Sequence, residues 1–161
     1  MSNNARKIPS LPVAVTGLAA FALSLLWYSP LLFGNIWIAL SHADPGAMPL
    51  WKMLIAPVRE LLVAYVLAYL IVRLGIINLK PAANLGFGLW LAFHAVQMAG
   101  AVIWDNMPWM LGAIHAADWL MKMLFMAIVM TLWLRRESSF LLEMTRRDLD
   151  TGVPRRRSPA V

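Results

Sequence analysis

The chain has 161 residues, of which 61% are hydrophobic and only 14% charged, far from the composition of a soluble globular domain. It contains no cysteine, which excludes disulfides, zinc thiolates, iron–sulfur clusters and a thiol nucleophile. Its formal net charge is +6, but the basic residues flank apolar runs instead of forming one folded face, so we expect no nucleic acid partner.

Four apolar runs are each long enough to cross a bilayer, whose hydrocarbon core of about 30 Å needs about 20 helical residues. The runs cover residues 11–33, 53–72, 85–103 and 109–134. Helix breakers separate them: Asp44-Pro45-Gly46, then Gly75 and Pro81, then Asp105-Asn106-Met107-Pro108. The sequence therefore predicts an all-α membrane protein, a bundle of four transmembrane helices within residues 11–134.

The placement of lysine and arginine predicts the orientation of this bundle. With the N-terminal tail (1–10) inside, the connection Arg73–Lys80 and the arginine-rich segment after residue 134 are also inside. The outer loops then hold a single basic residue, Lys52. This one-sided bias predicts a multi-pass protein of the cell membrane, of the bacterial inner-membrane type, with both termini in the cytoplasm.

Shorter elements lie outside the four runs. Residues 36–40, in the first outer loop, are expected to form a brief interfacial helix. Residues 135–150 mix Phe140 and Met144 with acids and arginines, which predicts a short amphipathic helix on the cytoplasmic surface. We expect residues 151–161 to be a disordered basic tail, and anionic lipids to contact this C-terminal region.

Three stretches of the sequence are recognisable motifs. They are Leu26-Trp27-Tyr28-Ser29-Pro30-Leu31-Leu32-Phe33-Gly34, Ala64-Tyr65-Val66-Leu67-Ala68 and Gly86-Phe87-Gly88-Leu89-Trp90-Leu91. Together they resemble an uncharacterised group of small bacterial and fungal membrane proteins, the family called domain of unknown function 1761. The similarity covers roughly Pro12 to Trp133, and the first stretch is the specific one. The resemblance implies a four-helix membrane domain with no established activity, so it assigns no functional residue.

Ionisable residues inside the apolar runs are the candidate functional residues. Each charge near the bilayer centre costs about 2.5–3.5 kcal/mol unless it is paired. On the fourth run, His115, Asp118 and Lys122 follow i, i+3, i+7 spacing and so share one helix face. The sequence predicts a single buried polar cluster made up of Arg59, Glu60, His94, Gln97, His115, Asp118 and Lys122.

Depth along the helices predicts which of these groups pair. Arg59 lies about 9 Å below Met53, and Asp118 about 13 Å below Trp109. Opposite charges at similar depth predict an ion pair between Arg59 and Asp118. Since Arg59 and Glu60 are adjacent and point about 100° apart, we expect no pair between them. Glu60 is then expected to contact His94 or His115.

The cluster supports several functions. The leading expectation is a structural or accessory subunit, in a homo-oligomer or a larger membrane complex, because paired buried charges fix helix geometry. The alternative is a small channel or carrier for protons or a small polar solute, since ionisable residues inside a membrane mark such paths. We expect no cofactor. In an alternative interpretation, His94 and His115 are the ligands of a bound haem or metal ion. No catalytic motif such as H-E-x-x-H or G-x-S-x-G occurs, so we expect no enzyme.

Overall fold

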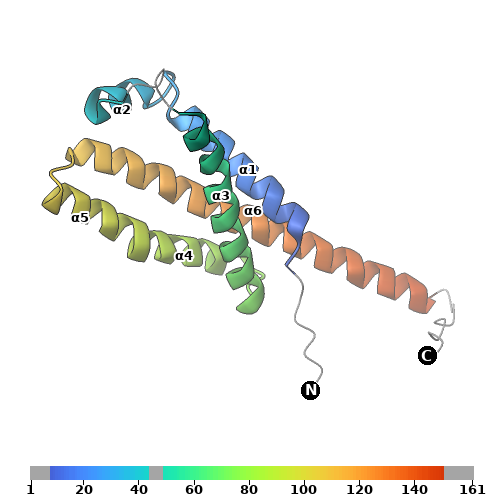
Figure 1. Ribbon diagram of the computed structural model, residues 1–161. Helices are drawn as coiled ribbons and strands as arrows, with labels where there is room; N and C mark the ends of the chain where they lie inside the picture. Colours follow the sequence, from blue (N-terminus) through green and yellow to red (C-terminus); the bar gives the residue numbers. More distant parts are fainter. Residues whose placement is uncertain (1–7, 44–48, 151–161) are drawn as a thin grey trace, which may run out of the picture.

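The computed structural model describes residues 8–43 and 49–150, and these residues contain helices and no strand (Figure 1). The helices in chain order are α1 (Ser10–Trp27), α2 (Gly34–Ser41), α3 (Leu50–Arg73), α4 (Leu79–Leu89), the π-helical segment η2 (Trp90–Ala95), α5 (Val96–Trp104) and α6 (Trp109–Asp150). Four stretches are long and apolar enough to cross a membrane, namely α1, α3, the run Leu79–Trp104 and Trp109–Met144. The predicted all-helical class and the four apolar spans are confirmed. The predicted disordered tail (151–161) and most of the N-terminal tail lie outside the described residues.

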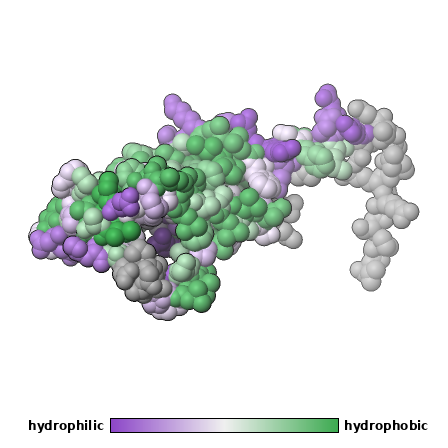
Figure 2. Space-filling model, turned by 90° about the horizontal axis from the view of Figure 1, so that it is seen from above, coloured by the Kyte–Doolittle hydropathy of each residue, from purple (hydrophilic) through white to green (hydrophobic). Residues whose placement is uncertain are grey.

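The outer surface of the molecule suits a membrane environment. Large apolar side chains of every membrane-length helix are exposed, among them Leu18, Leu62, Phe93 and Leu132. Figure 2 shows hydrophobic residues over much of the visible face. In water such a surface would promote aggregation, whereas lipid chains cover it without cost.

The first helix is shorter than predicted, because α1 ends at Trp27 instead of Phe33. Pro30 has no N–H to continue a helix, and the chain turns back on itself, with the N–H of Gly34 donating to the carbonyl of Ser29 at 3.0 Å. A Cβ atom on Gly34 would collide with the carbonyl oxygen of Tyr28, so the turn requires glycine. The helix predicted around residues 36–40 is present as α2, which starts at this glycine.

The third membrane-length helix starts at Leu79 and not at the predicted Leu85. Treating Pro81 as a break was wrong, because it occupies the first turn of α4, where a backbone N–H has no helical acceptor to lose. The helix continues to Trp104 through η2, whose turns are wider than those of an α-helix. This widened segment carries His94.

The tightest packing joins α1, α3, α4 and α6. We call this part the apolar core and define it by nine residues that are fully or almost fully buried: Ala20, Ala64, Leu67, Ala68, Ile71, Ala82, Met126, Ala127 and Met130. Glycines allow the helices to approach closely. A Cβ atom on Gly86 of α4 would lie 2.9 Å from the backbone oxygen of Met123 on α6, so this contact is made backbone to backbone.

The last helix, α6, runs without a break from Trp109 to Asp150 and spans 42 residues. Residues 135–150 contain neither glycine nor proline to end it. The predicted separate helix over 135–150 is therefore wrong in its boundary, since this segment continues α6. At 1.5 Å per residue α6 is about 63 Å long, roughly twice the thickness of a bilayer core, and Figure 1 shows its C-terminal part extending past the other helices.

Candidate functional site: a buried charge cluster beside a pocket

Lys122 of α6 is the centre of the buried cluster. Its Nζ lies 2.9 Å from Oε1 of Glu60 on α3 and 2.9 Å from Oδ2 of Asp118, one turn earlier on α6. All three side chains are buried. Because Asp118 and Lys122 are separated by four residues, the helix itself places them side by side. The ammonium of Lys122 thus joins α3 to α6 through its charge-assisted hydrogen bond to Glu60, and its ion pair with Asp118 lies within α6.

Two side chains of the first helical region complete the cluster. Ser24 of α1 donates a hydrogen bond to Oδ1 of Asp118 at 2.9 Å. The hydroxyl of Tyr28 lies 2.7 Å from Nδ1 of His115, and the Tyr28 ring packs edge-on against Trp37 of α2. Ser24, Tyr28 and Trp37 were not predicted from the sequence as members of the cluster. The signal that could have found the first two is their i, i+4 spacing, which puts both polar groups on one face of an apolar helix.

Arg59 does not pair with Asp118. Its Nη2 lies 3.3 Å from Oε1 of Glu60, its guanidinium stacks 5.0 Å from the ring centre of Trp119, and its side chain is 55% exposed. The predicted Arg59–Asp118 pair is therefore wrong, and so is the expectation that Arg59 and Glu60 stay apart. The helix turns Glu60 inward and Arg59 outward, and the long, flexible arginine side chain folds back to reach its neighbour.

Only one of the two carboxylate oxygens of Glu60 has partners among the described residues. Both Lys122 and Arg59 bind Oε1, whereas Oε2 is buried and has no hydrogen-bond partner among the described residues. The predicted contact between Glu60 and a histidine is thus wrong. An unpaired buried acceptor costs about 1–3 kcal/mol, and such a group in a native fold calls for an explanation.

Trp119 lines two separate hollows beside the predicted cluster, and His94 remains within electrostatic range of Asp118 and Lys122. Five members of the cluster (Arg59, Glu60, His115, Asp118 and Lys122) gather in one group. His94 packs its ring 5.0 Å from that of Trp119 and lines a different hollow together with the exposed Gln97. No three or more His, Asp or Glu side chains in the described ranges lie so that they could hold a metal ion.

Beside the five-residue group lies a hollow of about 460 Å³, which we call the polar pocket. Four aromatic side chains line it, Phe21, Tyr28, Trp37 and Trp119, and so do five charged or polar ones, Ser24, Arg59, Glu60, His115 and Asp118. Leu25, Met53 and Ala56 complete the wall. The volume is in the range of small-molecule sites, about 300–1,000 Å³, and apolar walls with a few convergent polar groups are typical of them.

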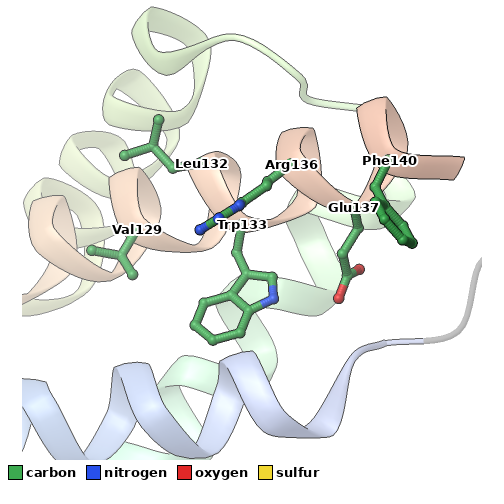
Figure 3. Close-up of a pocket in the computed structure, with 6 residues that line it drawn as sticks. All are labelled: Val129, Leu132, Trp133, Arg136, Glu137 and Phe140. Atoms are coloured by element: carbon green, nitrogen blue, oxygen red, sulfur yellow. The ribbon is translucent and has the colours of Figure 1, made fainter. Parts of the chain in front are cut away.

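Two other hollows are lined by fewer charged and polar side chains. One, of about 470 Å³, lies where α3, η2 and α6 meet, and its only polar lining groups beside Trp90 and Trp119 are His94 and Gln97. The other, of about 490 Å³, follows α6 near residue 133, and Figure 3 shows its lining side chains spread along that helix. Among the described residues, the lining of the hollow of about 490 Å³ has no buried polar atom without a partner, and that of the hollow of about 470 Å³ has one, Nε2 of His94. We assign no binding to either.

The helices and the cluster define a class of protein. Four apolar helices and internally paired charges are compatible with a multi-pass membrane protein. The sequence profile of a family of unknown function, DUF1761, matches residues 11–131, and the chain belongs to this family. The resemblance expected from the three motifs is thereby confirmed. No curated protein and no solved structure is significantly similar to the chain, so its function has to be inferred from the site itself.

Proposed function

We propose that the chain is a small carrier that binds a polar solute in the polar pocket. The observation that supports this most directly is the Glu60 carboxylate, which lines the pocket and has a buried oxygen without a partner in the described part of the chain. A solute that donates a hydrogen bond to Glu60 would remove the free-energy cost of leaving this oxygen unpaired. Intramembrane ionisable residues are the usual markers of solute pathways.

The packing on the far side of Lys122 favours a carrier over an open channel. Along α6, Lys122 is followed one and two turns later by Met126 and Met130, both completely buried in the apolar core. A solute in the polar pocket therefore meets closely packed methionine and alanine side chains on the other side. A carrier opens its site to one side at a time, which agrees with a pocket that is closed at one end.

We also propose that the pocket faces the outside and that both termini are cytoplasmic, because lysine and arginine gather at the opposite end of the bundle. Reporter fusions at Val161 and near Gly46 test this orientation. The two fusions should give opposite outcomes, and the same outcome from both would refute the proposed topology.

Solute binding is tested with purified protein in liposomes. Tetramethylammonium, acetate and tert-butanol represent cationic, anionic and neutral solutes, and tryptophan fluorescence and solute flux are the readouts. At least one solute should give a saturable response, and Glu60→Gln should abolish it. Glu143→Gln is the matched control, since Glu143 is an exposed acid of α6, with Arg147 as an ion-pair partner and no part in the pocket. No saturable response, or the same response in Glu60→Gln, would refute the proposal.

An accessory subunit is the second candidate. It is favoured by the C-terminal part of α6, which extends past the other helices and exposes Phe140 and Leu142. Detergent extraction of the native membrane followed by affinity purification tests it. A subunit should co-purify with a larger complex in fixed proportion and show no flux of its own, whereas a carrier should purify alone and be active.

A further inference from the structure

We infer that the solute is a small organic cation and that Arg59 occupies its place when the pocket is empty. This inference rests on the proposed function and adds the charge of the solute to it. The buried groups Glu60 and Asp118 carry two carboxylates, and the buried Lys122 supplies only one positive charge. A net negative charge in a site of low polarity is unfavourable, so a second cation would stabilise the site.

In the structure Arg59 supplies that second positive charge, but its contact with Glu60 is loose. The nitrogen–oxygen distance is 3.3 Å, whereas charge-assisted hydrogen bonds are usually about 2.7–2.9 Å long. By contrast, Lys122 is completely buried and lies 2.9 Å from each carboxylate. Lys122 is therefore a fixed part of the site, while Arg59 can move away at small cost.

The walls of the polar pocket fit an organic cation. Phe21, Tyr28, Trp37 and Trp119 line it, and the Trp119 face already attracts the guanidinium of Arg59. Aromatic faces beside a carboxylate are a favourable site for ammonium groups, above all for quaternary ammonium ions. If such an ion replaces Arg59, the site keeps its charge balance. An anion would instead meet Glu60 and Asp118, and a neutral solute would gain nothing from the charge.

The experiment is a titration of the full-length protein in nanodiscs with tetramethylammonium, tert-butanol of similar size, and acetate, followed by calorimetry and tryptophan fluorescence. Tetramethylammonium should bind and the other two should not. Arg59→Gln should bind tetramethylammonium about fivefold more tightly, because a partly exposed competing charge is removed. The matched control is Arg73→Gln. Arg73 also stacks on an aromatic ring, that of Tyr69, but it lies at the other end of α3, so the affinity should not change.

The outcomes separate the two proposals. If acetate or tert-butanol binds in a manner that depends on Glu60, the carrier proposal holds and the cation inference is refuted. If Arg59→Gln weakens the binding of tetramethylammonium, the resident-cation inference is likewise refuted. If none of the three solutes binds, both proposals fail. Should Glu60→Gln not fold, Trp37→Leu keeps all the charges and should weaken tetramethylammonium binding about tenfold. Unchanged affinity in that variant would refute the aromatic part of the site.

Discussion

The polar pocket and the apolar core share the inward faces of α3 and α6, yet they are held together by different forces. On α6 the inward residues at every fourth position are Asp118, Lys122, Met126 and Met130. On α3 the inward face carries Glu60, Ala64, Leu67 and Ile71. The α6 stripe starts with two charged residues and the α3 stripe with one, and both continue with apolar residues. Helical periodicity thus decides which residues are buried, but residue chemistry decides what the burial requires.

The two halves should therefore fail in different ways. The charged half depends on complete pairing, since losing one partner leaves a charge in a medium that solvates it poorly. The apolar half depends on volume, because its helices touch through alanine and glycine. Substitutions that change charge or volume alone can distinguish the two.

The largest effect is expected from Lys122→Met. The side chain keeps its length, but Glu60 and Asp118 lose the ammonium between them, and breaking a buried pair costs about 3–5 kcal/mol. Unfolding in detergent by heat or by sodium dodecyl sulfate measures the loss, with the exposed Lys80→Met as control. Combining Lys122→Met with Glu60→Gln should cost less than the sum of the two single changes. Simple additivity would show that Lys122 and Glu60 are not partners.

A smaller effect, about 1–3 kcal/mol, is expected from Gly86→Ala in the apolar half. The added Cβ would lie 2.9 Å from the backbone oxygen of Met123, so α4 and α6 have to move apart. Gly88→Ala is the control on the same helix, because a Cβ atom there meets nothing within 4 Å. The same unfolding assay should separate the two variants. Equal stability would mean that α4 and α6 are less closely packed than described.

The smallest effect, and the only gain, is expected from Thr16→Val on α1. Thr16 is buried, and its Oγ1 has no hydrogen-bond partner among the described residues, so a methyl group in its place should stabilise the protein by about 1 kcal/mol. Thr131→Val provides the comparison, since Thr131 Oγ1 donates to the Ala127 carbonyl at 2.8 Å and its loss should bring no gain. A destabilised Thr16→Val would indicate that this hydroxyl has a partner after all.

Helix existence was predictable from the sequence, and helix rotation was not. Hydropathy located all four spans, although Pro81 lies inside the third, and the four-residue spacing of Asp118 and Lys122 already implied that they are neighbours. Depth, however, gives the height of a residue and not the direction of its side chain. Arg59 and Glu60 are equally deep, and only the packing of α3 on α6 turned Glu60 inward. The π-helical turns of η2, which carry His94, have no signature in composition.

The unbroken length of α6 has a mechanical consequence. The helix carries pocket residues near one end and extends far past the core at the other, with Met126 between them. If α6 tilts by about 10° about Met126, Lys122 moves about 1 Å, whereas the backbone at Asp150 moves about 6 Å. The helix therefore acts as a lever with a short arm beside the buried charges and a long arm beyond the bundle, so a movement of about 1 Å around the charges becomes a displacement of several ångströms at its far end.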